Sequence, residues 1–298
     1  MSGQNYKIRF IFVPNKRYFM KALSFIIPIT LICCACASDT SKSCIPSYGF
    51  WAGYDLCDTT MITTNPGNVE RDFVEYINQI YYKEKDSLKV EFDEFIRCIS
   101  SCPRSEEFFT GLTEKYLYRY RSTPHIENMY LTFLECYTAS PYIANENKIR
   151  PQMQISDIRK NSPGSIATDF TYTLSSGIKS QMHDIKTPLT LLYFNNPLCE
   201  ECSATLEEMR NSSLLNDMIK NGEITVLSVY VDDQPQEWKD NLSHYPSNWI
   251  VAMDDGRVID NERLYVLRII PSIYLLGKDK EVILKNVLWA DVEKKLSK

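Results

Sequence analysis

Two stretches of the chain differ in the spacing of their apolar residues, and each spacing predicts a different kind of element. From about residue 48 to 158, apolar side chains recur at steps of three and four residues, as on one face of an amphipathic helix. Four such runs cover residues 73–81, 88–99, 108–120 and 126–134. They predict a small bundle of antiparallel helices joined by short turns.

The pattern changes after the turn-rich stretch Asn161-Ser-Pro-Gly-Ser165, where the apolar residues form continuous runs. Such runs are typical of strands that are covered on both faces. Strands are expected at residues 187–194, 224–231, 249–253, 272–276 and 282–288, and helices at 202–220, 236–244 and 261–267. Strands that alternate with helices and then end in two closing strands predict an α/β sandwich.

Residues 20–36 have the pattern of a secretory signal. Lys21 precedes a short apolar core at residues 23–32, which is too short for a comfortable membrane span. The end of this segment, Cys33-Cys34-Ala35-Cys36, resembles the lipobox of bacterial lipoproteins, which has a small residue before the modified cysteine. The resemblance implies lipidation at Cys36, with Cys34 as the alternative. A plain signal peptide and an uncleaved anchor are the other interpretations.

The segments on either side of the signal complete the expected organisation. Residues 1–19 are either an extended n-region or a start-site artefact, in which case Met20 is the true start. Residues 36–47 are polar and without periodicity, which predicts a lipidated tether. The expected order is a signal peptide at 1–35, the tether, a helical domain at 48–160 and an α/β domain at 161–298.

Composition and charge narrow the classes of function. The chain has 298 residues, of which 44% are hydrophobic, and this is enough for two domains with cores of their own. The formal net charge of −5 argues against nucleic-acid binding. Removal of residues 1–35, which hold five basic and no acidic residues, would leave 28 basic against 38 acidic residues, a charge of −10. An acyl chain, rather than a basic patch, would then hold the protein at the membrane.

One motif contains candidate catalytic residues. Cys199-Glu-Glu-Cys202 directly follows the first strand expected in the α/β domain and opens a helix. Unpaired backbone N–H groups and the helix dipole stabilise a thiolate at a helix start, and the thiolate is the form that attacks. Cys199 is therefore predicted to attack, and Cys202, one turn further on, to resolve the mixed disulfide. Glu200 and Glu201 would raise the pKa of the thiol, which favours a reductant or moderate exchanger of roughly −200 to −270 mV.

From about Gly164 onward the chain resembles thioredoxin-like thiol-disulfide oxidoreductases of the bacterial envelope, of the TlpA/ResA type. The matching segments are Ile166–Phe170, Pro188–Cys202, Tyr230–Asp233 and Tyr265–Gly277. The resemblance implies a thioredoxin-like α/β domain with a central mixed sheet flanked by helices. It also implies a cis Ile270–Pro271 peptide bond that faces the cysteines, with neighbouring backbone that pairs with an extended substrate segment.

This sequence departs from the family at two positions. Leu198 stands where the family has a tryptophan, and Thr205 stands where ResA-like members have a glutamate. Both departures argue against the family's usual task in cytochrome maturation. Asn196 argues against a peroxiredoxin, which would have a threonine there. In the helical part, Phe50-Trp51, Asp58-Thr-Thr60 and the run at 73–81 resemble a domain of unknown function that precedes thioredoxin-like domains in some bacterial lipoproteins.

The other cysteines and the histidines do not suggest a metal site. His125, His183 and His244 are isolated, and no second pair accompanies the C-x-x-C motif, so neither zinc nor another cofactor is expected beyond a redox-active Cys199–Cys202 disulfide. Five cysteines remain, and their pairing stays open: Cys44, Cys57, Cys98, Cys102 and Cys136. At least one of these five lacks an internal partner. Cys98 and Cys102 are expected to pack as small apolar side chains.

These features predict a lipid-anchored thiol:disulfide oxidoreductase of the cell envelope, which faces the periplasm or lies on the outer-membrane surface. Its partners would be protein thiols or disulfides, and the membrane through the lipid. The competing hypothesis is a non-catalytic binding lipoprotein. In that case the thioredoxin fold is a scaffold, and the helical domain binds a protein partner.

Overall fold

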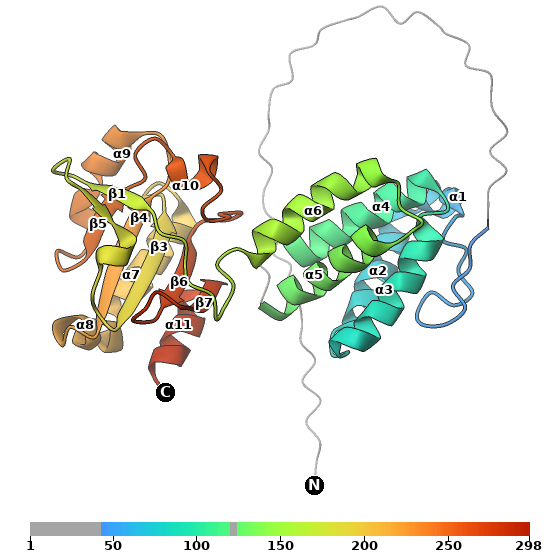
Figure 1. Cartoon of the computed structure of the whole chain (residues 1–298), viewed down its shortest axis with the longest axis horizontal. Helices are drawn as coiled ribbons and strands as arrows, with labels where there is room; N and C mark the ends of the chain where they lie inside the picture. Colours follow the sequence, from blue (N-terminus) through green and yellow to red (C-terminus); the bar gives the residue numbers. More distant parts are fainter. Residues whose placement is uncertain (1–42, 120–123) are drawn as a thin grey trace, which may run out of the picture. The chain divides into compact units, whose positions relative to one another are not determined.

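A computed structural model describes residues 43–119 and 124–298 of the chain (Figure 1). The predicted signal, the lipobox with Cys36 and most of the predicted tether lie outside these residues. Within the described part, no helix combines the length and the apolar character that crossing a membrane requires.

Helices make up most of the described residues between 59 and 160, and the four runs of three- and four-residue spacing correspond to four of them. In chain order these are α1 Thr59–Thr64, α2 Pro66–Ile80, α3 Lys85–Ile99, α4 Pro103–Glu114, a π-helical turn η1 Lys115–Arg119, α5 Pro124–Ala139 and α6 Asn145–Arg159.

Aromatic side chains fill the core of this helical region. Phe73 and Tyr76 of α2, Phe95 of α3 and Phe109 of α4 are all fully or almost fully buried. Trp51, from the segment before α1, packs against this group, with its ring centroid 5.6 Å from that of Phe109. Buried aromatic rings contribute large apolar areas and favour edge-to-face contacts of this kind. The irregular segment at residues 43–58 is thereby part of the core.

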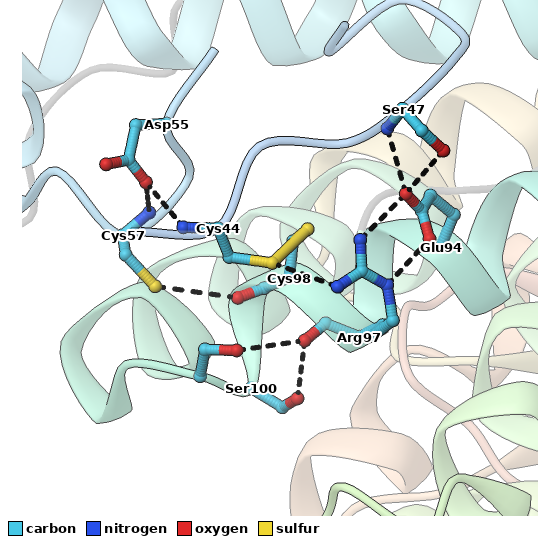
Figure 2. The surroundings of a disulfide bond; sticks show 9 residues. Cys44, Ser47, Asp55, Cys57, Glu94, Arg97, Cys98 and Ser100 are labelled. Atoms are coloured by element: carbon cyan, nitrogen blue, oxygen red, sulfur yellow. Dashed lines mark hydrogen bonds and ion pairs between the residues drawn. A yellow bond between two sulfur atoms is a disulfide. The ribbon is translucent and has the colours of Figure 1, made fainter. Parts of the chain in front are cut away.

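A disulfide bond fastens the same segment to α3. It joins Cys44 to Cys98, and Arg97 donates a hydrogen bond to the Cys44 sulfur over 3.3 Å (Figure 2). Glu94 accepts hydrogen bonds from Arg97 and from the Ser47 backbone N–H, and the Arg97 contact chiefly lowers the pKa of this carboxyl to about 2. The expectation that Cys98 packs as an apolar thiol is therefore wrong, because α3 presents it to a cysteine 54 residues away.

Residues 161–298 form a mixed sheet of seven strands with helices beside it, which confirms the predicted fold class (Figure 1). The strands are β1 Thr171–Leu174, β2 Lys179–Gln181, β3 Leu189–Asn195, β4 Ile224–Tyr230, β5 Ile250–Met253, β6 Ser272–Leu276 and β7 Val282–Val287. Their order across the sheet is β2-β1-β5-β4-β3-β6-β7. Strands β5, β4 and β3 run parallel, and β6 runs antiparallel to β3.

Each face of the sheet has its own core, because successive side chains of a strand point to opposite faces. Leu191 and Tyr193 of β3 contribute to the face that α7 Glu200–Asn211, α8 Ser213–Lys220 and α11 Trp289–Leu296 cover. Leu192 and Phe194 contribute to the core on the opposite face, which also contains Tyr172 of β1 and Ile259 of α10 Val258–Asn261. The continuous apolar run of β3 thus serves two cores at once.

Two predicted helices differ from the observed ones. The helix expected at 202–220 is divided into α7 and α8 at Ser212, whose hydroxyl accepts a hydrogen bond from the Leu215 N–H and caps α8. The helix expected at 261–267 is wrong. Helix α10 ends at Asn261, and Arg263 has a φ of 52°, a left-handed conformation that stops a helix. Between residues 236 and 244 the structure has α9 Pro235–Asp240 and a short 3-10 turn.

Candidate active site

The candidate site lies where the central strand β3 ends and α7 begins (Figure 1). Strand β3 ends at Asn195, beside the end of the parallel strand β4. In open α/β sheets, ligands bind outside the carboxyl ends of the parallel strands. The four-residue connection from Asn196 to Cys199 therefore places the cysteine motif at the edge of the sheet where chemistry is expected.

Cys199 is the N-cap residue of α7. Its backbone is extended, with φ −81° and ψ 122°, and its Sγ accepts a hydrogen bond from the Cys202 N–H over 3.3 Å. The position satisfies one of the backbone donors that a helix start leaves unpaired. The same N–H group would stabilise negative charge on the sulfur. The predicted place of Cys199 at the helix start is confirmed.

Cys202 lies one turn further on and is 1% exposed, whereas Cys199 is half-buried. The Tyr193 hydroxyl donates a hydrogen bond to the Cys202 carbonyl oxygen over 2.6 Å, which holds this first turn of α7 against β3. Only the first cysteine is therefore open to a large partner. This asymmetry fits the predicted roles, in which Cys199 attacks and Cys202 resolves.

The peptide bond between Ile270 and Pro271 is cis, as the family resemblance implied. The Ile270 carbonyl oxygen lies 3.9 Å from the Cys199 Sγ, which donates a weak hydrogen bond to it. The sheet brings the two segments together, because β6 begins at Ser272 and pairs antiparallel with β3. Leu198, which replaces the tryptophan of the family, is 62% exposed next to Cys199. The Cys199 sulfur thus has the Ile270 backbone beside it, and the residue before Cys199 in the chain is an exposed apolar side chain.

A network of buried hydrogen bonds lies beside the cysteine motif, at the end of β3. This network was not predicted from the sequence. The Asn195 Oδ1 accepts a hydrogen bond from the Tyr245 hydroxyl over 2.6 Å, and its Nδ2 donates to the Ser228 hydroxyl over 2.8 Å. Burial raises the pKa of the Tyr245 phenol, so this group stays protonated and remains a donor. The feature of the sequence that pointed to this network is Asn195, a polar residue at the end of an otherwise apolar strand.

A small cavity of about 20 Å³ adjoins this network and the buried cysteine. Its lining includes Cys202, Asn195, Tyr245 and His244. His244 is exposed, and it also borders this cavity. A space of this size with several polar neighbours has room for one water molecule.

We expect Asn195→Ala to lower the free energy of unfolding by about 2–3 kcal/mol, because it removes one hydrogen-bond partner from each of the buried Tyr245 and Ser228 hydroxyls. Urea unfolding of the full chain measures the change. Asn248→Ala, at an exposed position, is the matched control and should be nearly neutral. A loss below about 0.5 kcal/mol for Asn195→Ala would show that the network does not stabilise this part of the fold.

The remaining polar residues of the motif lie at its rim. Asn196 donates a hydrogen bond to Asp232 over 3.1 Å, which ties the loop after β3 to the loop after β4. Glu200 and Glu201 are exposed in the first turn of α7, where solvent weakens their effect on the sulfur. Across residues 43–119 and 124–298, no group of three or more histidine, cysteine or acidic side chains could hold a metal ion.

Comparisons with known proteins agree with this geometry. Residues 47–161 match the family model "Domain of unknown function (DUF5106)". A solved structure of a thioredoxin-like protein from Bacteroides caccae is 30% identical, covers 85% of this chain and 90% of its own, and superposes with a TM-score of 0.74. The C-terminal domain of an uncharacterized protein from Bacteroides fragilis is 38% identical over 46% of this chain and 99% of its own, with a TM-score of 0.46.

A curated relative is more distant. The probable nucleoredoxin 3 of Oryza sativa subsp. japonica is 21% identical over 225 residues, which are 72% of this chain. The chain spans 46% of the length of that relative.

Proposed function

Since this chain belongs to the thioredoxin-like proteins, we propose that it is a thiol:disulfide oxidoreductase that uses Cys199 and Cys202 as its redox-active dithiol. One observation carries the proposal. The half-buried Cys199 sulfur caps α7, receives the Cys202 N–H and lies 3.9 Å from the Ile270 carbonyl oxygen. A nucleophilic sulfur next to backbone that can pair with an extended protein segment is what this exchange requires.

The reaction has two exchange steps. The Cys199 thiolate attacks one sulfur of a substrate disulfide, forms a mixed disulfide and releases the other substrate sulfur as a thiolate, which takes up a proton. Cys202, as a thiolate, then attacks the Cys199 sulfur and releases the second substrate thiol. Two electrons pass to the substrate, and Cys199 and Cys202 become a disulfide. An external dithiol donor restores the pair by the reverse exchange.

The substrate would bind along the backbone at Ile270 and Pro271. The Cys199 Sγ contacts the Ile270 carbonyl oxygen, so a segment bound there places its cysteine against the attacking sulfur. Leu198, exposed and adjacent to Cys199 in the chain, offers an apolar contact to such a segment. The proposed substrates are therefore protein thiols or disulfides in unfolded or extended segments. The names of several relatives, which include the nucleoredoxin, agree with this class.

We also propose that the protein acts outside the cytoplasm, anchored by lipid at Cys36. The support is the lipobox-like end of the predicted signal together with the Cys44–Cys98 disulfide. Disulfides of this structural kind persist in oxidising compartments and are rare in the cytosol. Metabolic labelling with a fatty acid should mark the wild-type chain and not Cys36→Ser, and labelling of both would contradict the anchor.

Trapping of the mixed disulfide tests the enzymatic proposal. We expect Cys202→Ser to accumulate a covalent complex with an oxidised protein substrate, because the attack by Cys199 proceeds and the resolving sulfur is absent. A non-reducing gel should show a higher band that collapses when dithiothreitol is added. The variant with both Cys199→Ser and Cys202→Ser is the control, and a band of equal strength in that control would overturn the proposal.

A binding function is the second candidate, favoured by a cavity in the helical region. The cavity has a volume of about 690 Å³, within the usual range for ligand sites, and lies among α4, α5 and α6. Glu106, Arg150 and Tyr137 are among its lining residues. If this function is the principal one, Cys199 should react with a thiol reagent no faster than a cysteine in a short peptide.

A further inference from the structure

Beside the Cys44–Cys98 disulfide, the helical region holds two more cysteines at the same place. Cys57 lies just before α1, and Cys102 is the N-cap residue of α4. The Cys57 Sγ donates a weak hydrogen bond to the Cys98 carbonyl oxygen over 3.7 Å, and Figure 2 shows this sulfur pointing at that oxygen. All four cysteines thus lie where the segment at residues 43–58 meets the connection between α3 and α4.

The Cys57 and Cys102 side chains are in direct contact, since they form a hydrogen bond with each other. Cys57 is 2% exposed, whereas Cys102 is half-buried and packs at the border of the helical core. Burial and the Cys102 sulfur together raise the pKa of Cys57 to about 12, so Cys57 is protonated while the pair is reduced. Cys102 is therefore the sulfur that an external reagent reaches first.

The backbone on both sides of this contact is fixed by hydrogen bonds. The Asp55 Oδ1 accepts hydrogen bonds from the N–H of Cys44 over 2.9 Å and from the N–H of Cys57 over 3.0 Å. The Cys102 N–H donates to the Ile99 carbonyl oxygen over 3.3 Å. The existing disulfide joins the same two segments four residues before Cys102. A second cross-link would therefore join two segments that the first disulfide already holds together.

We propose that Cys57 and Cys102 are a second dithiol site, which an external disulfide oxidises to a Cys57–Cys102 bond in parallel with Cys44–Cys98. The oxidised helical region would carry two cross-links between the segment at 43–58 and the end of α3. The site lies outside the Cys199–Cys202 motif and does not depend on the activity proposed for it.

Oxidation of Cys57 and Cys102 takes two thiol–disulfide exchange steps. The Cys102 thiolate attacks the external disulfide, becomes half of a mixed disulfide and releases the first external thiol. Cys57 then loses its proton, attacks the Cys102 sulfur and releases the second external thiol. The two protein thiols are oxidised by two electrons, and the external disulfide is reduced to two thiols. The effect of Cys102 on the pKa of Cys57 ends once the Cys102 sulfur is in the mixed disulfide.

This pairing leaves Cys136 as the odd cysteine of the five that the sequence left open. Cys136 is buried on α5 and lies near the Lys89 carbonyl oxygen of α3. Burial is the main reason that its pKa is raised to about 12, which keeps it an unreactive thiol. It is therefore a suitable internal control for the chemistry at Cys102.

The positions of Arg and Lys make a direct test possible by mass spectrometry. Trypsin would place Cys44 and Cys57 in one peptide, 43–71, and Cys98 and Cys102 in another, 98–104. The full chain is incubated with oxidised glutathione, denatured in acid, alkylated with iodoacetamide and digested without reduction. We expect the two peptides to be linked and to carry no alkyl group. A linked pair that carries two alkyl groups, or glutathione on Cys102, would overturn the proposal.

Single substitutions assign the bond to its two cysteines. In Cys57→Ser the two peptides should remain linked through Cys44–Cys98, while Cys102 becomes alkylated or glutathionylated; Cys102→Ser should likewise leave Cys57 alkylated. Cys136→Ser is the matched control and should leave the unalkylated linked pair unchanged. If Cys102 stays protected in Cys57→Ser, its partner is another residue and the assignment is wrong. These readouts use peptide masses, so they do not depend on enzymatic activity.

Discussion

Cys199→Ser is expected to lower the rate of insulin reduction to that of dithiothreitol alone. A serine hydroxyl at the start of α7 cannot form the mixed disulfide, because it is neither ionised at neutral pH nor able to leave as a thiolate does. The N-cap geometry is compatible with serine, which is itself a favoured N-cap residue, so the fold should persist. The measurement is the onset of turbidity as the insulin B chain precipitates.

Two further variants make this assay specific. Cys202→Ser should also fail in turnover, but it should release one substrate thiol per molecule in a burst, since only the resolving step is lost. Cys136→Ser carries the same chemical change at a buried position far along the chain from the motif, and it should keep the wild-type rate. Equal curves for the wild type and Cys199→Ser would refute the enzymatic proposal and favour the binding function.

Loss of the Cys44–Cys98 disulfide is expected to destabilise the helical region by about 4 kcal/mol. The bond spans 54 residues, and a cross-link over a loop of this length restricts the unfolded chain by about that free energy in the chain-entropy description. The change to make is Cys44→Ala together with Cys98→Ala, since alanine introduces no buried hydroxyl at the fully buried Cys98. This loss would be a large part of the stability of an ordinary domain.

Urea unfolding monitored by amide hydrogen exchange in α2 and α3 measures the stability of the helical region separately from that of the sheet. Mild reduction of the wild-type protein provides the comparison, because it opens the same bond without a change of side-chain volume. The two losses should agree within about 1 kcal/mol, the spread expected for the packing of one small side chain. Unchanged protection in both samples would mean that the core, rather than the cross-link, holds the segment at residues 43–58.

The spacing of apolar residues predicted the larger elements because each is a local property. The runs at 187–194 and 224–231 correspond to β3 and β4, which are buried on both faces. The strands β1 and β2 have only four and three residues and are partly exposed, so the sequence has no continuous apolar run at either position. Helix α6 was missed for a similar reason: only Asp157 and Ile158 are buried in it, and it has no apolar stripe to detect.

The two cysteines of the candidate site were predictable from the sequence, and their surroundings were not. Cys199 and Cys202 stand three residues apart after an apolar strand, and this spacing alone predicts a cysteine at a helix start with a second cysteine one turn away. The position of Pro271 came from a family resemblance rather than from the pattern. Tyr245, which supports Asn195 below the motif, gave no signal, because an isolated tyrosine in a loop has no periodicity.

The sequence by itself determined the class of each half of the chain and the spacing of the two cysteines in the C-x-x-C motif. These features depend on residues within a few positions of one another, where the helix turn and the strand pleat fix the geometry. Only the tertiary structure decided that Cys44 pairs with Cys98, that Cys57 contacts Cys102 and that the Ile270 carbonyl oxygen meets Cys199. Those contacts join residues 45 or more positions apart in sequence. Their partners are selected by how whole helices and strands pack, and no local spacing encodes that choice.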